Sequence, residues 1–208
     1  MRRLGRWSAA LAVVLVAVGM SARAAEPYRI RGTLVGVDDK ILTVLTDADE
    51  TVEIGLTDET GSFAVTPAKW SDIAAGQFVG ITSIETGGQR IALEVHIFAE
   101  DLRGTGEGHY PWDLVDEPNM MTNATVAEIE EVDPTRRQLR LTYKEGEAEG
   151  EQVIVVPDAV DVVALAKSEG PGLIAPDRRA FLLVVDAEQG PPTAIVVAVG
   201  LEGVTPPM

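Results

Sequence analysis

The stretch Arg90-Ile91-Ala92-Leu93-Glu94-Val95-His96-Ile97-Phe98 carries the pattern that decides the fold. Apolar and polar side chains alternate along it, and a period of two residues is typical of a half-buried β-strand. The apolar side chains from Leu93 to Ile97 that lie two positions apart share one face, and Glu94 and His96 lie on the other. The pattern therefore predicts a strand in which His96 faces away from the core of its own domain.

Short alternating stretches of the same kind recur along the chain from Ile30, separated by residues that favour turns. Helical periodicity is almost absent, except for one short helical turn expected at 71–76. The sequence therefore predicts an all-β protein. We expect twelve strands in two rounds of six, at about 30–37, 40–46, 51–56, 63–66, 78–84 and 90–98, and then at 125–132, 138–143, 152–156, 161–165, 180–185 and 193–199.

The second round repeats the layout of the first, although the identity between them is weak. Residues 92–97 correspond to 194–199, residues 72–76 to 173–177, and residues 32–38 to 123–129. Five or six short antiparallel strands in so few residues favour a small closed barrel of the oligonucleotide-fold type. We therefore predict two tandem small antiparallel β-barrels, which divide the chain into a signal peptide at 1–24, a first barrel at 28–100, a linker at 101–121, a second barrel at 122–203 and a tail at 204–208.

The first residues have the features of a secretory signal peptide. Three arginines among the first six residues precede an apolar run from Ala9 to Met20, and Ala22-Arg23-Ala24 is a small-x-small cleavage site. The apolar run is shorter than the roughly 20 residues that a membrane-spanning helix needs. We therefore expect a periplasmic or secreted protein with no membrane span in the mature chain. The sequence has no cysteine, so no disulfide contributes to its stability.

The chain is strongly acidic, with 33 Asp and Glu against 17 Lys and Arg and a net charge of −16. Nucleic acid and anionic lipid require a basic face on the protein that binds them, and this composition argues against both. Cations and basic partners are electrostatically permitted. Acidic balance also keeps exported proteins soluble, so the charge by itself selects no ligand.

The segment from Gly104 to Asp113, Gly-Thr-Gly-Glu-Gly-His-Tyr-Pro-Trp-Asp, gathers unusual residue types between the two rounds of strands. Tyr110 and Trp112 are either an anchor for a partner or a plug that fills the groove between two barrels. Asp113 belongs to the same candidate interface. The plug is favoured because two small domains without disulfides gain stability by packing together. The sequence thus predicts that this linker docks the domains.

The motifs around 94–98, 103–113 and 121–126, together with the chain ending at 203–208, carry a family resemblance. The chain resembles exported proteobacterial proteins of unknown function that are sometimes labelled as metal ABC transporter permeases. The resemblance implies a tandem β-domain periplasmic protein and gives a hint of metal. The permease label conflicts with this sequence, which has no transmembrane segment beyond the signal.

Two histidines and several carboxylates are the candidate metal ligands. His109 lies thirteen positions after His96, within its reach if the glycines fold the segment back, and Glu94 and Glu107 are nearby carboxylates. Two imidazoles with one or two carboxylates suit zinc, copper or nickel. The alternative is that both histidines only form hydrogen bonds that dock the linker. Apart from this divalent metal, the sequence indicates no cofactor.

Catalytic motifs are missing from the sequence. There is no Gly-x-Ser-x-Gly elbow, and without cysteine there is no thiol nucleophile. We therefore predict a non-enzymatic binding or structural module that acts on a protein or small ligand, with the linker docking the two domains. The alternative hypothesis is a periplasmic metal-binding accessory protein that uses His96 and His109.

Overall fold

A computed structural model describes residues 26–168, 170 and 172–208. The predicted signal peptide lies outside these residues. Thirteen β-strands and two short 3-10 turns occur in the described part. The strands are β1 (Tyr28–Asp38), β2 (Ile41–Thr46), β3 (Thr51–Gly55), β4 (Gly61–Pro67), β5 (Phe78–Thr86), β6 (Gln89–Phe98), β7 (Gly108–Trp112), β8 (Asn119–Asp133), β9 (Arg136–Glu145), β10 (Ala148–Pro157), β11 (Asp161–Lys167), β12 (Arg179–Val185) and β13 (Thr193–Gly200).

The all-β prediction is confirmed, and each of the twelve expected strands is present within a few residues of its predicted ends. The expected helical turn is a 3-10 turn at Trp70–Asp72. The difference lies in the predicted linker, where β7 forms and β8 already begins at Asn119. The sequence did not predict β7 because its glycines and Pro111 are unfavourable in most strands. Proline has no backbone N–H to donate to a neighbouring strand, so it is found at sheet edges. Here β7 is such an edge, paired with β8 alone.

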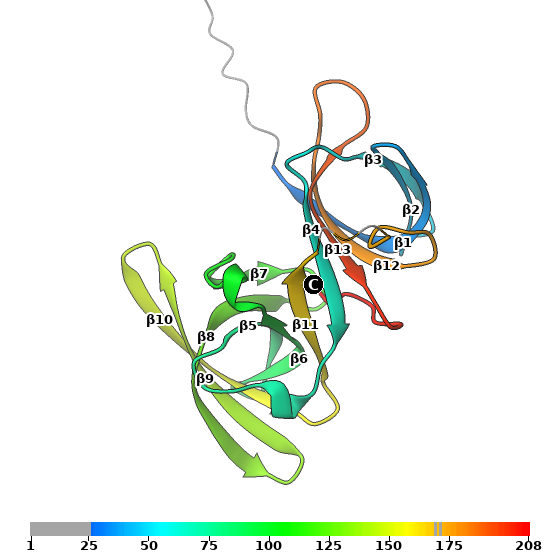
Figure 1. Cartoon of the computed structure of the whole chain (residues 1–208). Coiled ribbons are helices and arrows are strands. Elements are labelled where there is room, and N and C mark those ends of the chain that lie inside the picture. Colours follow the sequence, from blue (N-terminus) through cyan, green and yellow to red (C-terminus); the bar gives the residue numbers. More distant parts are fainter. Residues whose placement is uncertain (1–25, 169, 171) are drawn as a thin grey trace, which may run out of the picture.

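The strands are connected in one sheet, with the order β10-β9-β8-β5-β6-β11-β4-β13-β12-β1-β2-β3. Figure 1 shows that this sheet folds into two lobes. Strands β1, β2, β3, β12 and β13 form what we call the terminal lobe, and β5 to β10 form the central lobe. Strands β4 and β11 pair with each other between the lobes. Additional parallel pairings join β10 to β6 and β13 to β3, so each lobe contains a ring of paired strands.

The second six long strands, β8 to β13, repeat the pairing of the first six, β1 to β6. The match extends to the irregularities. The bulge of β1 against β2 corresponds to the first of two register shifts of β8 against β9, and the β5–β6 and β12–β13 hairpins are each interrupted once. The last two strands are exchanged between the rounds, because β1 pairs with β12 and β8 pairs with β5. The two sequence ranges expected to fold separately thus contribute strands to both lobes.

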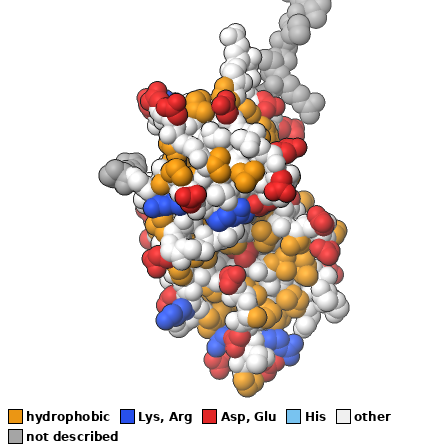
Figure 2. Space-filling view, turned by 90° about the vertical axis from the view of Figure 1, so that its right-hand side faces the viewer, with side chains coloured by type: hydrophobic (Ala, Val, Ile, Leu, Met, Phe, Trp, Pro, Cys, Tyr) orange, Lys and Arg blue, Asp and Glu red, His pale blue; other side chains and the backbone are white. Residues whose placement is uncertain are grey.

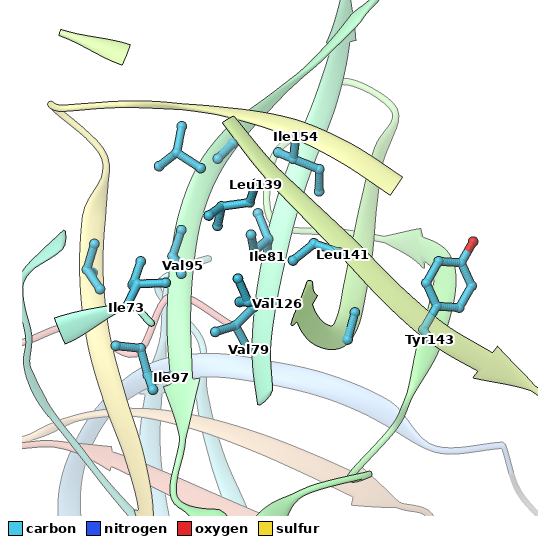
Figure 3. Packing of buried hydrophobic residues seen from close by; sticks show 14 residues of the cluster. Ile73, Val79, Ile81, Val95, Ile97, Val126, Leu139, Leu141, Tyr143 and Ile154 are labelled. Carbon is cyan, nitrogen blue, oxygen red and sulfur yellow. The ribbon is translucent and has the colours of Figure 1, made fainter. Parts of the chain in front are cut away.

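The described residues form three buried hydrophobic clusters. One lies inside the central lobe and includes Val79, Ile81, Val95, Ile97 and Leu139 (Figure 3). A second lies inside the terminal lobe. The third draws on both lobes and on the strands between them, and we call it the interlobe cluster. Its buried members are Val65, Phe78, Phe98, Leu102, Val163, Leu165, Phe181, Ala198 and Met208.

The surface reflects the acidic composition. Acidic side chains are spread over the face drawn in Figure 2, with only a few basic ones between them. A helix long and apolar enough to cross a membrane does not occur in the part of the chain that the structure describes.

Candidate functional site

Both faces of β6 are buried, and this places two ionisable side chains inside the protein. Val95 and Ile97 enter the central-lobe cluster, as the alternation predicts. The opposite face of β6 lies against the interlobe cluster, to which Phe98 belongs. Glu94 and His96 are each only 2% exposed there. His96 therefore faces away from the core of its own lobe, and the interlobe cluster covers it.

Glu94 and His96 form a hydrogen-bonded pair. The Oε2 atom of Glu94 lies 3.0 Å from Nδ1 of His96. Its Oε1 atom accepts hydrogen bonds from both the backbone N–H and the hydroxyl of Thr82, at 2.9 and 2.7 Å. These donors satisfy the carboxyl group and fix its orientation. In the tautomer whose Nδ1–H donates to Glu94, Nε2 carries a lone pair and can accept a hydrogen bond on the other side of the ring.

A row of three residues crosses β8, β5 and β6 beside this pair. Asn123 lies opposite Gly80, and Gly80 lies opposite His96. Residues opposite one another in a sheet point to the same face, so the Asn123 and His96 side chains share the space above Gly80. A Cβ atom at Gly80 would lie 1.9 Å from Nε2 of His96 and 2.5 Å from Oδ1 of Asn123. The absence of a side chain at position 80 makes this arrangement sterically feasible.

Asn123 connects the row to the glycine-rich segment. Its Nδ2 atom donates to the carbonyl oxygen of Thr105 at 3.2 Å and to the hydroxyl of Tyr110 at 3.1 Å. Its Oδ1 atom is buried and has no hydrogen-bond partner among residues 26–168, 170 and 172–208. A buried acceptor without a partner costs about 1–3 kcal/mol, so its presence requires a reason.

Trp112 on β7 packs between the lobes. Its ring stacks on Phe181 with centroids 6.4 Å apart, and the Arg29 guanidinium lies 3.7 Å from the ring centroid. Asp113 forms ion pairs with Arg29 and Arg31 of β1, at 3.1 and 2.8 Å. The segment expected to dock the domains therefore contacts the terminal lobe through Trp112 and Asp113. In the described part of the chain, no group accepts a hydrogen bond from the buried Nε1 atom of Trp112.

A cavity of about 170 Å³ lies where these residues meet. Its wall is mostly aromatic and aliphatic and comes from both lobes. Its polar members include His96, Asn123 and Trp112, and two of these carry the unpartnered atoms described above. The full lining is Phe63, His96, Phe98, Leu102, Thr105, Gly106, Tyr110, Trp112, Met121, Asn123, Leu165, Phe181, Val196, Ala198 and Met208.

A larger depression of about 590 Å³ lies elsewhere, lined by residues such as Trp70, Asp158 and Asp161. Within the described chain, none of the buried polar atoms that lack a partner belongs to its wall. An apolar cavity with a few convergent polar groups is the arrangement typical of a ligand site. The smaller cavity, which we call the interlobe cavity, is therefore the candidate site.

The four side chains expected to bind metal do not come together. His109 lies opposite Thr122, in the row of Ile81 and Val95, so it points to the other face of the sheet from His96. Its Nδ1 atom lies 2.8 Å from the Thr122 hydroxyl. Partial burial, and then the charge of Arg90, lower the pKa of His109 below its usual value.

Glu107 is also separate from the Glu94–His96 pair. Its carboxylate accepts a hydrogen bond from the backbone N–H of Lys144 at 3.1 Å. Across the described residues, no group of three or more His, Cys, Asp or Glu side chains is placed to hold a metal ion. Of the four expected ligands, the structure joins only Glu94 and His96.

Several residues of the site were not singled out from the sequence. Asn123, Gly80, Phe181 and Ala198 lie on four different strands, and they meet only through the exchange of strands between the rounds. One usable signal was Gly80 within a predicted strand, because a glycine in a strand often marks a close approach of another group.

No family model, no curated protein and no solved structure matches the chain. The resemblance noted from the sequence stays a prediction.

Proposed function

We propose that this protein is an exported, non-enzymatic binding protein, and that its ligand is a small, largely apolar molecule held in the interlobe cavity. The observation that carries the proposal is the unpartnered Oδ1 of Asn123, a side chain only 6% exposed in the wall of this apolar cavity. A bound molecule with a hydrogen-bond donor would satisfy that atom. Export rests on the signal-peptide pattern of the sequence.

The size of the cavity limits the ligand. Binding cavities for drug-sized molecules have about 300–1,000 Å³, whereas a cavity of about 150 Å³ accommodates benzene. A volume of about 170 Å³ therefore suits one substituted ring or a branched aliphatic compound of similar bulk. Phe181 and Trp112 would contact the faces of such a ring.

We propose further that the paired strands of each lobe form a small closed barrel of the oligonucleotide-fold type. The parallel pairings of β6 with β10 and of β3 with β13 support this, because each joins the two ends of a five-strand path. Each ring also has its own buried cluster. On this proposal the ligand lies between two barrels, outside the interior of either.

The test is the binding of single-ring probes to the mature protein, with benzene and phenol measured by thermal shift and by tryptophan fluorescence. Both should raise the melting temperature, because a ligand that binds only the folded state stabilises it. Ala198→Leu, which adds bulk to the cavity wall, should abolish the shift. Ile195→Leu, at an exposed position of the same strand, is the matched control. If neither probe shifts the wild-type protein at millimolar concentration, the proposed function is wrong.

A further inference from the structure

The wall of the interlobe cavity includes equivalent positions at which the two rounds of strands differ in chemistry. The interruption in the β5–β6 hairpin follows the pair Thr82 and Glu94, and the interruption in the β12–β13 hairpin follows the pair Leu183 and Val196. These pairs are therefore equivalent, and Glu94 corresponds to Val196.

Two residues further along each ladder lies the next equivalent pair. Gly80 lies opposite His96 in the first hairpin, and Phe181 lies opposite Ala198 in the second. Each pair combines a ring with a small residue. The ring of the first pair, His96, is on the second strand of its hairpin, whereas the ring of the second pair, Phe181, is on the first strand of its hairpin. The rings of His96 and Phe181 thus fill corresponding space in the two halves of the cavity wall.

The two hairpins fill equivalent positions of the fold with different side chains. In the second hairpin, the equivalent positions hold Phe181, Val196 and Ala198. These three side chains have no polar atoms. The first hairpin instead buries a carboxyl and an imidazole, and removing such groups from water is costly. Replacing a buried polar pair by well-packed apolar side chains of similar volume is often neutral or stabilising. Packing alone therefore does not account for Glu94 and His96.

We propose that His96 is the polar recognition group of the interlobe cavity, positioned by Glu94, and that the ligand is a single ring bearing a hydroxyl or N–H group that donates to Nε2 of His96. This inference rests on the proposed function and adds the chemical class of the ligand. Glu94 acts through His96: by accepting from Nδ1–H, it leaves Nε2 as an acceptor. Asn123 Oδ1 provides a second acceptor in the same wall.

The first measurement compares phenol with benzene on the wild-type protein. Phenol should bind about threefold to tenfold more tightly, the range expected from the net gain of one neutral hydrogen bond. Equal binding of the two probes would overturn this inference and leave the proposed function intact. Binding of neither would overturn both.

The second measurement uses Glu94→Gln, which keeps the volume of the side chain. The amide oxygen still accepts from Thr82, while the amide nitrogen donates to Nδ1 and forces the proton of the neutral ring onto Nε2. The preference should shift from phenol toward pyridine, a ring of similar size that only accepts. A merely structural role for Glu94 predicts weaker folding without this reversal. An unchanged ratio of phenol to pyridine affinity would contradict the inference.

The third measurement makes the pair apolar, as Glu94→Val and His96→Leu together. Gly80 is left unchanged, because a Cβ atom there would lie 2.5 Å from Asn123 Oδ1. We expect a folded protein with a melting temperature at least equal to that of the wild type. Its preference for phenol over benzene should be smaller than that of the wild type, with Asn123 Oδ1 as the remaining acceptor. Loss of the cooperative unfolding transition would show that the polar pair is needed for the fold, and would overturn the inference.

Discussion

Gly80 lies directly opposite His96 in the β5–β6 ladder, and a Cβ atom at Gly80 would lie 1.9 Å from His96 Nε2. We therefore expect Gly80→Ala to lower the free energy of unfolding by about 2 kcal/mol or more, as overpacked cores do. Urea denaturation measures the change. Gly55→Ala is the control, because its Cβ would meet no atom closer than 3.6 Å. A Gly80→Ala protein as stable as this control would contradict the geometry.

Trp112 is expected to stabilise the contact between the lobes by packing, and its N–H should contribute little. Trp112→Ala should cost about 2 kcal/mol, less than the 3–5 kcal/mol of a fully buried tryptophan. Trp112→Phe keeps a ring against Phe181 and removes an N–H that has no partner, so it should cost less than about 1 kcal/mol. Chemical denaturation of both variants tests this. A loss for Trp112→Phe as large as for Trp112→Ala would show that the N–H matters.

His109 should make stability depend on pH near neutrality. Burial lowers its pKa in the folded protein, so the unfolded chain binds the proton more readily. The stability that His109 contributes is therefore complete above about pH 6.5 and is lost as the pH falls from there through the lower folded pKa. His109→Gln, measured by urea denaturation at pH 5 and pH 8, should flatten this slope. A variant with the slope of the wild type would contradict this assignment.

The ion pair of Asp47 with Arg179 should raise the free energy of unfolding at neutral pH and contribute less in acid. Hydrogen bonds from Arg179, at 2.6 and 2.9 Å, hold the pKa of Asp47 below its usual value. Its contribution is therefore present above about pH 4, the unfolded pKa, and is lost as the pH falls through the folded pKa. Both side chains are partly exposed, so Asp47→Asn should cost at most about 1 kcal/mol at pH 7 and less at pH 3. Glu59→Gln, an exposed carboxylate on the same lobe, is the control, and an equal loss at both pH values would argue against the ion pair.

The exchange of strands between the rounds should make the two lobes unfold together. Leu42 and Leu139 occupy equivalent positions, opposite Ile54 and Ile154, and both are fully buried in different lobes. Leu42→Ala and Leu139→Ala should each lower the melting temperature of one single transition, at a cost of about 2–5 kcal/mol. Calorimetry tests this, and two separated transitions in either variant would contradict the coupling.

The strands were predictable because their signal is local. Alternation around Val95 and turn residues between the apolar stretches place each strand without knowledge of its partner. The correspondence of 92–97 with 194–199 was also visible, and the strand interruptions place Ala92 and Ala194 at equivalent positions. The correspondence of 32–38 with 123–129 is one position off, because the bulges make Leu34 equivalent to Val126.

The sequence by itself determined that the chain is all-β, that its strands come in two similar rounds, and that Glu94 and His96 share a strand face away from the adjacent core. Period and turn chemistry within a few residues are sufficient for these conclusions. Only the tertiary structure decided which strand pairs with which. Pairing depends on contacts between distant segments, and these place Phe181 and Ala198 across a cavity from His96, while the pleat of the sheet turns His109 to the opposite face.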